Sequence, residues 1–331
     1  MPGCKKFFLT ITLLVLCFQV NACSKGDNPD IQKKSKETRS PGRIYPENLF
    51  TVTFKDHYNG WACGYRGLIL RTRDGGKSWE QQNSRAKNSL NGVSFNDLSN
   101  GWIVGSGGLI LHTQDGGVKW EMQQSGTSED LLSIKFIDKN QGWAVGSRGT
   151  IIHTINGGKH WEYKPIGKDI ILNDVFFINA SQGWIVGESG TILYTDDGGN
   201  HWSEQLTSAG NKSLFCVFFI NVYEGWAVGV DGLIIHTRDG GKSWFVQQSN
   251  TVKHLYEIIF HGEVGICVGL NSTILYTKDF GRSWNRYPLP EKKPIFTWLR
   301  SVEYIPNGQF VAVGGRGTIL FLKPPLDEEH K

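Results

Sequence analysis

Seven short turns in this chain hold the residue types that could do chemistry. Each turn is a pair of residues between two small residues, and the pairs include arginines, a tyrosine and acids, at Arg66, Arg148, Arg316, Tyr65, Glu188 and Asp231. Three guanidinium groups that met at one point could bind the carboxylate of an acidic sugar. A tyrosine paired with a glutamate, together with a second acid, would then suit hydrolysis of that sugar. Arginines spread over one surface would instead suit binding to a polypeptide. The fold decides between these chemistries.

A pattern that recurs about every 41 residues organises the chain. Each full copy contains a Gly-Trp pair, which begins at Gly60, Gly101, Gly142, Gly183 and Gly225. Each closes on Gly-Gly-x-x-Trp, which ends at Trp79, Trp120, Trp161, Trp202 and Trp244, and a degenerate sixth closing copy ends at Trp284. A fixed period of this length is typical of repeat architectures, in which each repeat is one supersecondary unit.

The third copy shows what the unit is. Its β-prone or alternating segments are 132–136, 143–145, 150–154 and 161–163, and Gly-rich turns separate them. Four antiparallel strands per repeat of about 40 residues are the blade of a β-propeller. Counting the turns gives seven, so the sequence predicts an all-β fold, a seven-bladed β-propeller with four antiparallel strands per blade.

The seventh copy lacks the Gly-Gly-x-x-Trp end and is therefore one strand short. It contains the segments 299–305, 310–314 and 318–323 and then runs into Pro324 and Pro325. The extended segment 43–45 is a candidate for the missing strand. Closure of the ring in this way would leave no sheet edge unpaired at the join.

The turn after the third strand of each blade has its own signature, Thr-x-Asp-x-Gly-x-x-Trp, known as the Asp-box or BNR repeat. Its carboxylate and threonine hydroxyl can accept hydrogen bonds from turn N–H groups, and its tryptophan fills the space between sheets. The acidic position is an aspartate in five copies and an asparagine in one: Asp74, Asp115, Asn156, Asp197, Asp239 and Asp279. These residues are expected to be structural.

The ring places the paired turn residues on the face that also carries the linkers between blades. Residues at equivalent positions of different blades are spread around this face, so the arginines and acids are not expected to converge. Blades seven and one become neighbours on closure, which should bring Arg66 and Arg316 close together, with Arg300 near them. Trp298 is the tryptophan outside the repeat positions, and this makes it a candidate partner contact.

The first 23 residues are typical of an export signal. Two lysines precede an apolar run at 7–20 that is short for a membrane span, and Val20-Asn21-Ala22-Cys23 resembles a bacterial lipobox with Cys23 as the lipidated residue. Plain cleavage after Ala22 is the alternative. Residues 24–42 are polar and predict a disordered tether, 43–323 the propeller, and 324–331 a polar tail. We expect an exported lipoprotein, anchored in the bacterial cell envelope at the periplasm or outer-membrane face.

Composition gives no sign of a metal, cofactor or nucleic-acid site. The net charge is +4, and no basic run lies beside aromatic residues in a recognisable module. The histidines recur at repeat positions and are expected to be structural, as are Cys63, Cys216 and Cys267, which fall in strand segments. We expect a monomer without a cofactor.

The combination of Gly-Trp-Ala-Val-Gly, Gly-x-x-Gly-Thr-Ile-Leu-x-Thr and Asp-Gly-Gly-x-x-Trp resembles the photosystem II stability/assembly factor family of seven-bladed propellers. The resemblance covers residues 45–323. It implies a non-enzymatic, membrane-associated factor that binds a membrane-protein client, or its exposed tail, through an arginine-bearing face. The matching positions are Arg66, Arg148, Arg300 and Arg316, whereas the second and sixth turns carry no charge.

Asp-boxes also occur in sialidases and other glycoside hydrolases, so a sialidase-like enzyme is the alternative function. Against it, the linkers are short and regular, and sialidases usually have six blades. The sequence therefore favours a protein-binding scaffold, and the pattern itself also occurs in bacteria that do not photosynthesise.

Overall fold

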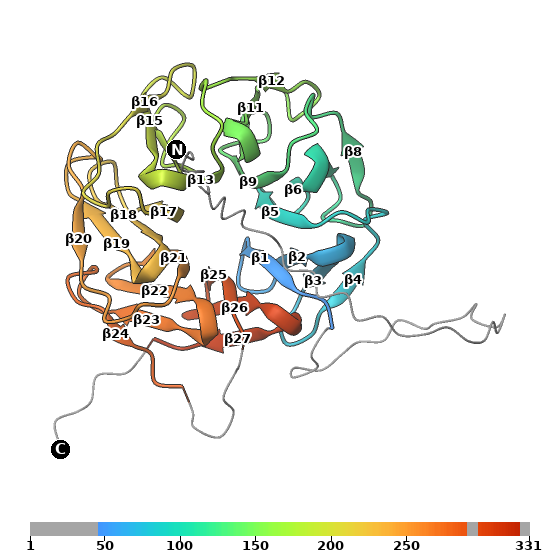
Figure 1. The fold of residues 1–331 in the computed structure, drawn as a ribbon. Helices are drawn as coiled ribbons and strands as arrows, with labels where there is room; N and C mark the ends of the chain where they lie inside the picture. The colour runs from blue at the N-terminus through green and yellow to red at the C-terminus, as the bar shows by residue number, and fades with distance from the viewer. Residues whose placement is uncertain (1–45, 290–296, 325–331) are drawn as a thin grey trace, which may run out of the picture. The chain divides into compact units, whose positions relative to one another are not determined.

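A computed structural model describes residues 46–289 and 297–324, all of which belong to one compact unit, Thr38–Lys331 (Figure 1). Within them, six four-stranded antiparallel sheets and one three-stranded sheet follow one another in chain order. The sheets are arranged around a central axis like the blades of a propeller, with the first strand of each blade innermost (Figure 1). The predicted seven-bladed all-β fold is confirmed.

The strands and the short 3-10 turns, labelled η, have the following bounds. Blades one to three contain β1 (Leu49–Phe54), β2 (Gly60–Gly64), η1 (Tyr65–Gly67), β3 (Ile69–Thr72), β4 (Glu80–Gln82), β5 (Leu90–Phe95), β6 (Gly101–Gly105), η2 (Ser106–Gly108), β7 (Ile110–Thr113), β8 (Glu121–Gln123), β9 (Leu131–Phe136), β10 (Gly142–Gly146), η3 (Ser147–Gly149), β11 (Ile151–Thr154) and β12 (Glu162–Tyr163). Blades four and five contain β13 (Leu172–Phe177), β14 (Gly183–Gly187), η4 (Glu188–Gly190), β15 (Ile192–Thr195), β16 (Ser203–Glu204), β17 (Leu214–Phe219), β18 (Gly225–Gly229), η5 (Val230–Gly232), β19 (Ile234–Thr237) and β20 (Phe245–Gln247). Blades six and seven contain β21 (Leu255–His261), β22 (Val264–Gly269), η6 (Leu270–Ser272), β23 (Ile274–Thr277), β24 (Asn285–Arg286), β25 (Leu299–Ile305), β26 (Gln309–Gly314), η7 (Gly315–Gly317) and β27 (Ile319–Leu322).

The Gly-Trp pair is explained by packing between blades. Trp61 of blade one stacks on Phe95 of blade two, with ring centroids 3.7 Å apart, and the same stack recurs at the next seams. The other side of the Phe95 ring lies against Gly101, where a Cβ would come within 2.3 Å of it. Each phenylalanine is therefore held between a glycine of its own blade and a tryptophan of the preceding blade. Only glycine leaves room for this arrangement.

Two seams lack the tryptophan. The equivalent positions are Ile266 in blade six and Val311 in blade seven, and each lies in an apolar cluster with its next blade. Blade seven has three strands among the described residues, as predicted, and the candidate closing strand at 43–45 lies outside them. Blades seven and one still join, because Val52 N donates to Ser301 Oγ at 3.2 Å and an apolar cluster fills the seam.

The Asp-box turns have the predicted hydrogen bonds. In blade one, Thr72 Oγ1 donates to Asp74 Oδ1 at 2.8 Å, while Gly76 N donates to Thr72 Oγ1 and Ser78 N donates to Asp74 Oδ1. In blade three, Asn156 Oδ1 accepts the corresponding bond from its threonine at 3.0 Å. The aspartate and the asparagine at this position thus accept the same turn hydrogen bonds.

Hydrogen bonds also show which turns share a face. Gly67 N of η1 donates to Asn88 O in the linker to blade two, at 2.8 Å, so the η turns and linkers form one face, the linker face. Gly75 N of the first Asp-box donates to Tyr58 O in the β1–β2 hairpin at 2.9 Å, which defines the opposite Asp-box face. The η turns differ from the two-residue loops expected: each is a 3-10 turn whose second residue is left-handed.

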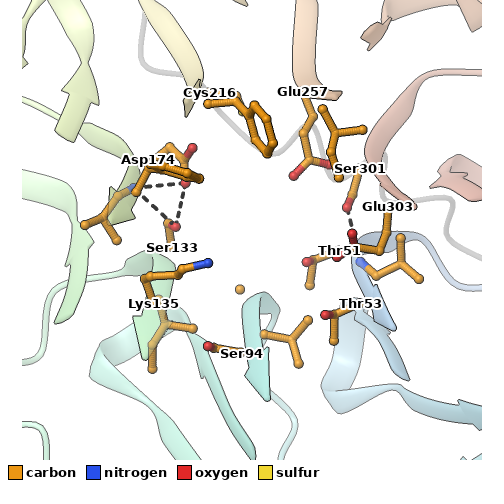
Figure 2. Close-up of a pocket in the computed structure, with 18 of the residues that line it drawn as sticks. Thr51, Thr53, Ser94, Ser133, Lys135, Asp174, Cys216, Glu257, Ser301 and Glu303 are labelled. Carbon is orange, nitrogen blue, oxygen red and sulfur yellow. Dashed lines mark hydrogen bonds between the residues drawn. The ribbon is translucent and has the colours of Figure 1, made fainter. Parts of the chain in front are cut away.

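A channel of about 550 Å³ runs between the inner strands, and polar side chains line it (Figure 2). Asp174 connects three blades, because Oδ1 accepts a hydrogen bond from Ser133 Oγ at 2.7 Å and Oδ2 accepts one from Val217 N at 3.1 Å. Burial raises the pKa of Glu257 to about 8 and that of Glu303 to about 7. Lys135 points into the same channel, and burial lowers its pKa.

We expect Asp74→Ala to lower the free energy of unfolding by about 1–3 kcal/mol, because turn N–H and hydroxyl donors lose their acceptor. Asp74→Asn should cost clearly less, since Asn156 makes the equivalent bonds in blade three. Equilibrium unfolding in guanidinium chloride would measure both. An equal loss in the two variants would mean that the carboxylate charge, rather than the hydrogen bonds, stabilises the turn.

The channel carboxyls predict a pH dependence of stability. Their pKa values are higher in the folded protein than the usual value of about 4.3 in an unfolded chain, so folding favours their protonated form. Their contribution is complete below about pH 4.3 and is lost as the pH rises through 7 to 8. We expect the double variant Glu257→Gln and Glu303→Gln to show a shallower fall in melting temperature than the wild type between pH 5 and pH 9.

The comparison isolates these two groups, because Lys135 is present in both proteins. The Asp-box acids titrate lower: hydrogen bonds from the backbone and ring of His201, for example, lower the pKa of Asp197 to about 2. Parallel melting curves for the two proteins would show that the channel carboxyls are ionised in the folded state at neutral pH.

Candidate functional site

Three η turns present arginines in a conformation that arginine does not favour. Arg66, Arg148 and Arg316 have φ values of 54°, 54° and 57°, in the left-handed region. The other four blades carry Gly107, Ser189, Asp231 and Asn271 at this position, and glycine, aspartate and asparagine are the usual choices there. All three arginine side chains are exposed. The turn conformation does not require arginine, so the role of each arginine lies in the surroundings of its side chain.

One asparagine connects the turns that carry Arg66 and Arg316. The main-chain oxygen of Asn48 accepts a hydrogen bond from Tyr65 N at 2.9 Å. Its side-chain Oδ1 accepts a hydrogen bond from Arg316 N, also at 2.9 Å. The two turns, 250 positions apart in the sequence (316 minus 66), are therefore attached to a single residue at the join of blades seven and one.

Aromatic residues lie at the same join, and a third arginine, Arg300, follows them in β25 and contacts blade six. The Trp298 ring stacks on Phe50 with centroids 6.0 Å apart, and Trp298 O accepts a hydrogen bond from Gly315 N of η7 at 3.0 Å. Arg300, the second residue of β25, places its guanidinium 5.2 Å from the centroid of the Tyr256 ring. Both Arg300 and Tyr256 line the channel.

Tyr256 stays neutral at the mouth of this channel. Burial raises the pKa of its phenol, and the nearby Arg300 charge only partly opposes that effect. The ring therefore offers a neutral aromatic face to the guanidinium, which is a cation–π arrangement.

We call Phe50, Arg66, Trp298, Arg300 and Arg316 the seam site. Within the described residues, no carboxylate forms an ion pair with its three arginines. Unpaired guanidinium groups beside aromatic rings are suited to a ligand that carries carboxylates and apolar groups. Of the predicted partner-binding residues, Arg66, Arg316 and Trp298 lie at the join of blades seven and one, whereas the guanidinium of Arg300 lies over Tyr256 of blade six. Their role in binding stays a prediction.

Arg148 is not part of this group. It lies on blade three, with blade two between it and the seam, and its Nε is 3.8 Å from Glu129 Oε2. It is therefore partly neutralised by a neighbour in its own blade linker. The two turns that carry Arg66 and Arg316 are thus connected to each other, with Arg300 in the neighbouring strand β25, and Arg148 lies apart from them.

The residues proposed for glycoside hydrolysis also remain apart. Glu188 and Asp231 lie on blades four and five, across the ring from Arg66 and Arg316. Glu188 Oε2 accepts a hydrogen bond from Ile171 N, and Asp231 Oδ2 is 3.7 Å from Lys212 Nζ. Each acid is engaged locally, and the geometry of a convergent acidic-sugar site is absent from these turns.

Sequence reasoning missed Asn48, Phe50, Tyr256 and the channel residues. A signal was present: the inner strands all begin with leucine, and their second, third and fifth positions face the channel. Those positions include polar and charged residues such as Arg300, Asp174 and Glu303. Aligning the inner strands would have separated the buried positions from the channel positions.

The remaining predicted structural residues lie as expected. Cys63, Cys216 and Cys267 are free and buried, and burial raises the pKa of each thiol. Three repeat histidines, His112, His153 and His236, stack on tryptophans, as His112 does on Trp102 with centroids 4.5 Å apart. Among the described residues, no helix has both the length and the apolar character to cross a membrane.

Known proteins resemble this chain in sequence and in fold. The family described as "Photosynthesis system II assembly factor YCF48" matches residues 43–126, 118–204, 165–251 and 211–301. A curated relative, the chloroplastic photosystem II stability/assembly factor HCF136 of Cyanidioschyzon merolae, is 56% identical over 34 residues, which are 10% of this chain and only 8% of that protein.

Two solved structures share the fold. "YCF48 bound to D1 peptide" has a TM-score of 0.72 and 19% identity, with 90% of this chain and 97% of that chain covered. "YCF48 from Cyanidioschyzon merolae" has a TM-score of 0.71 and 20% identity, with 87% and 98% covered. Because the family matches together span residues 43–301, this chain belongs to the YCF48 photosystem II assembly factor family of seven-bladed propellers.

Proposed function

We propose that this protein is a non-catalytic assembly factor that binds the exposed tail of a membrane-protein client at the seam site. This proposal rests mainly on the observation that Arg66, Arg300 and Arg316 form no ion pair with a described carboxylate, while Phe50 and Trp298 stack on each other at the join that carries Arg66 and Arg316. An extended peptide with carboxylates and an apolar residue would satisfy both kinds of group.

The family supports this proposal in general terms. A solved relative is described as bound to a D1 peptide, and its likeness to this chain is one of fold. Binding of a peptide by this chain rests on its own residues, above all on the shared attachment of η1 and η7 to Asn48. A rigid attachment reduces the loss of conformational freedom when a peptide orders the two arginines.

Charge is distributed unevenly over the linker face. The seam site is basic, whereas Glu188 and Asp231 lie on blades four and five across the ring. A client with unevenly distributed charge would dock in one orientation on such a surface.

We further infer that the chain is exported and held at a membrane by a lipid on Cys23, with residues 24–42 as a tether. The lipobox-like sequence before Cys23 supports this inference. An anchored scaffold would search for its clients in two dimensions, close to the membrane in which they are assembled.

We expect the double variant Arg66→Glu and Arg316→Glu to reduce client capture by about tenfold or more, because two attractive contacts become repulsive. Quantitative crosslinking and affinity purification from native membranes would measure capture, and thermal unfolding should be unchanged. Arg148→Glu is a matched control, since it changes the same turn position outside the seam.

Three results are informative about this site. Unchanged yield in the double variant would exclude the seam site. An equal loss in Arg148→Glu would indicate a contact over the whole linker face. Turnover of a fluorogenic sialoside that is abolished by Glu188→Gln would contradict the non-catalytic function and support the hydrolase alternative.

The anchor has its own test. Cys23→Ser should move the protein from the membrane fraction to the soluble fraction and abolish incorporation of radiolabelled palmitate. Labelling that persists in this variant would show that the lipid, if present, is attached elsewhere.

A further inference from the structure

A second groove lies on the Asp-box face, opposite the seam site. Its volume is about 560 Å³, and blades five and six both contribute to it. Residues of the β17–β18 hairpin line one part, and the Asp-box turns of the two blades line the rest: Ile220, Asn221, Tyr223, Glu224, Arg238, Phe280 and Arg282. No step of the proposed seam-site function uses these residues.

Phe280 is the unusual residue of this groove. It has φ of 55°, in the left-handed region, where a bulky side chain is a genuine outlier. The other five Asp-boxes place a glycine at the same position, namely Gly75, Gly116, Gly157, Gly198 and Gly240. The Phe280 side chain is 42% exposed, so burial in the core does not explain its presence. Backbone strain of this kind concentrates at functional sites.

A second change in the same blade makes room for this side chain. In blade one, a Cβ on Gly75 would lie 2.8 Å from His57 O of the facing β1–β2 hairpin. The equivalent hairpin of blade six is shorter, because His261 pairs with Val264 and only Gly262 and Glu263 connect them. Phe280 N still donates to Glu263 O at 3.1 Å. The short hairpin and Phe280 are thus two linked changes by which blade six differs from the other blades.

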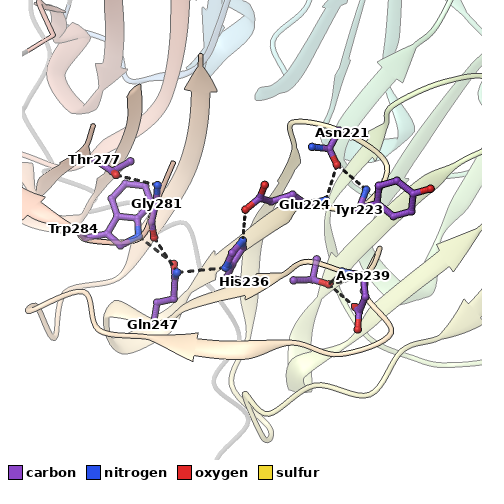
Figure 3. A network of polar contacts seen from close by, with 11 residues as sticks. Asn221, Tyr223, Glu224, His236, Asp239, Gln247, Thr277, Gly281 and Trp284 are labelled. Carbon is purple, nitrogen blue, oxygen red and sulfur yellow. Dashed lines mark hydrogen bonds and ion pairs between the residues drawn. The ribbon is translucent and has the colours of Figure 1, made fainter. Parts of the chain in front are cut away.

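Tyr223 provides the second exposed ring. Its side chain is 66% exposed, while its backbone is fixed, since Tyr223 N and Glu224 N both donate to Asn221 Oδ1 at 2.9 Å (Figure 3). The loop is therefore ordered by its own hydrogen bonds, and within the described residues the exposed Tyr223 ring has no hydrogen-bond or ring partner.

The charges of the groove are unbalanced. Glu224 is the acidic residue that lines the groove, and its Oε1 is 3.2 Å from His236 Nε2 (Figure 3). Arg238 and Arg282 are exposed, and no described carboxylate forms an ion pair with either. Two guanidinium groups thus flank two exposed aromatic rings.

Gln247 fixes the two sides of the groove relative to each other. Its Nε2 donates to Gly281 O at 2.9 Å, and its Oε1 accepts a hydrogen bond from Trp284 Nε1 at 3.2 Å (Figure 3). Gln247 belongs to blade five, and both of its partners belong to the Asp-box of blade six that carries Phe280. The groove is preformed, which favours binding.

We propose that this groove docks an acidic segment of a partner polypeptide that has an aromatic or aliphatic residue beside its carboxylates. The arginines complement the acidic groups, and the apolar residue lies between Tyr223 and Phe280. Exposed tyrosine, arginine and phenylalanine at a preformed depression are the residue types that dominate protein–protein contacts. This site is independent of the seam site.

The test measures binding of a fluorescein-labelled peptide of alternating glutamate and phenylalanine by fluorescence anisotropy. Saturable binding to the wild type is expected, and the same peptide with glutamine for glutamate should bind at least about tenfold more weakly. The variants Phe280→Gly and Arg238→Glu with Arg282→Glu should each weaken binding by a similar factor.

Phe280→Gly also separates function from folding. Glycine adopts the left-handed conformation freely, so this variant should unfold at a higher temperature than the wild type while it loses the peptide. The matched control is Arg73→Glu with Lys77→Glu, which changes the equivalent Asp-box positions of blade one and should leave binding unchanged. Arg66→Glu with Arg316→Glu should also leave it unchanged, so a failure of one site does not imply failure of the other.

Several outcomes would overturn the proposal. They are absence of peptide binding, equal affinity in Phe280→Gly, and equal losses in the blade-one control. Binding to vesicles of phosphatidylglycerol that depends on Arg238 and Arg282, without binding to the peptide, would reassign the groove to a lipid surface.

Discussion

The stack of a tryptophan on the phenylalanine of the next blade is the contact on which this molecule depends. A sheet cannot bury both of its faces alone, so each blade needs a neighbour whose shape fits it. Trp61, Phe95 and Gly101 provide that fit at the first seam, and the same trio recurs at the next four. The blades consequently form a regular ring, and side chains at equivalent positions are spread around it.

This regularity explains why chemistry arises where the repeat is broken. Blade seven carries Val311 in place of the tryptophan, and its turn is attached through Asn48 to the turn of blade one. Arg66 and Arg316, which form no ion pair with a described carboxylate, lie at that join. Blade six has the shortened hairpin and Phe280 in place of glycine, and Phe280 lines the groove. Each candidate site thus combines residues that depart from the repeat, such as Phe280, with contacts that the repeat shares, since Asp130 and His254 attach neighbouring turns as Asn48 does.

The two sites lie on opposite faces, and both combine arginine with exposed or half-buried aromatic rings. A scaffold with contacts on both faces could hold two segments at a fixed separation, because the ring between them is rigid. The channel has a different character. Burial raises the pKa of its carboxyl groups, and Asp174, for example, accepts hydrogen bonds from both neighbouring blades. The channel is therefore a polar structural core.

The sequence by itself determined the fold, the number of blades and the Asp-box bonds, because local periodicity and turn chemistry specify each blade almost independently of the others. It also indicated that Arg66 and Arg316 would be neighbours, which follows from ring order alone. Only the tertiary structure decided that Arg148 stands apart with Glu129, that Asn48 holds two turns together, and that Phe280 lines a groove with Tyr223. These features depend on side-chain directions and on contacts between distant blades, and a repeat pattern does not encode them.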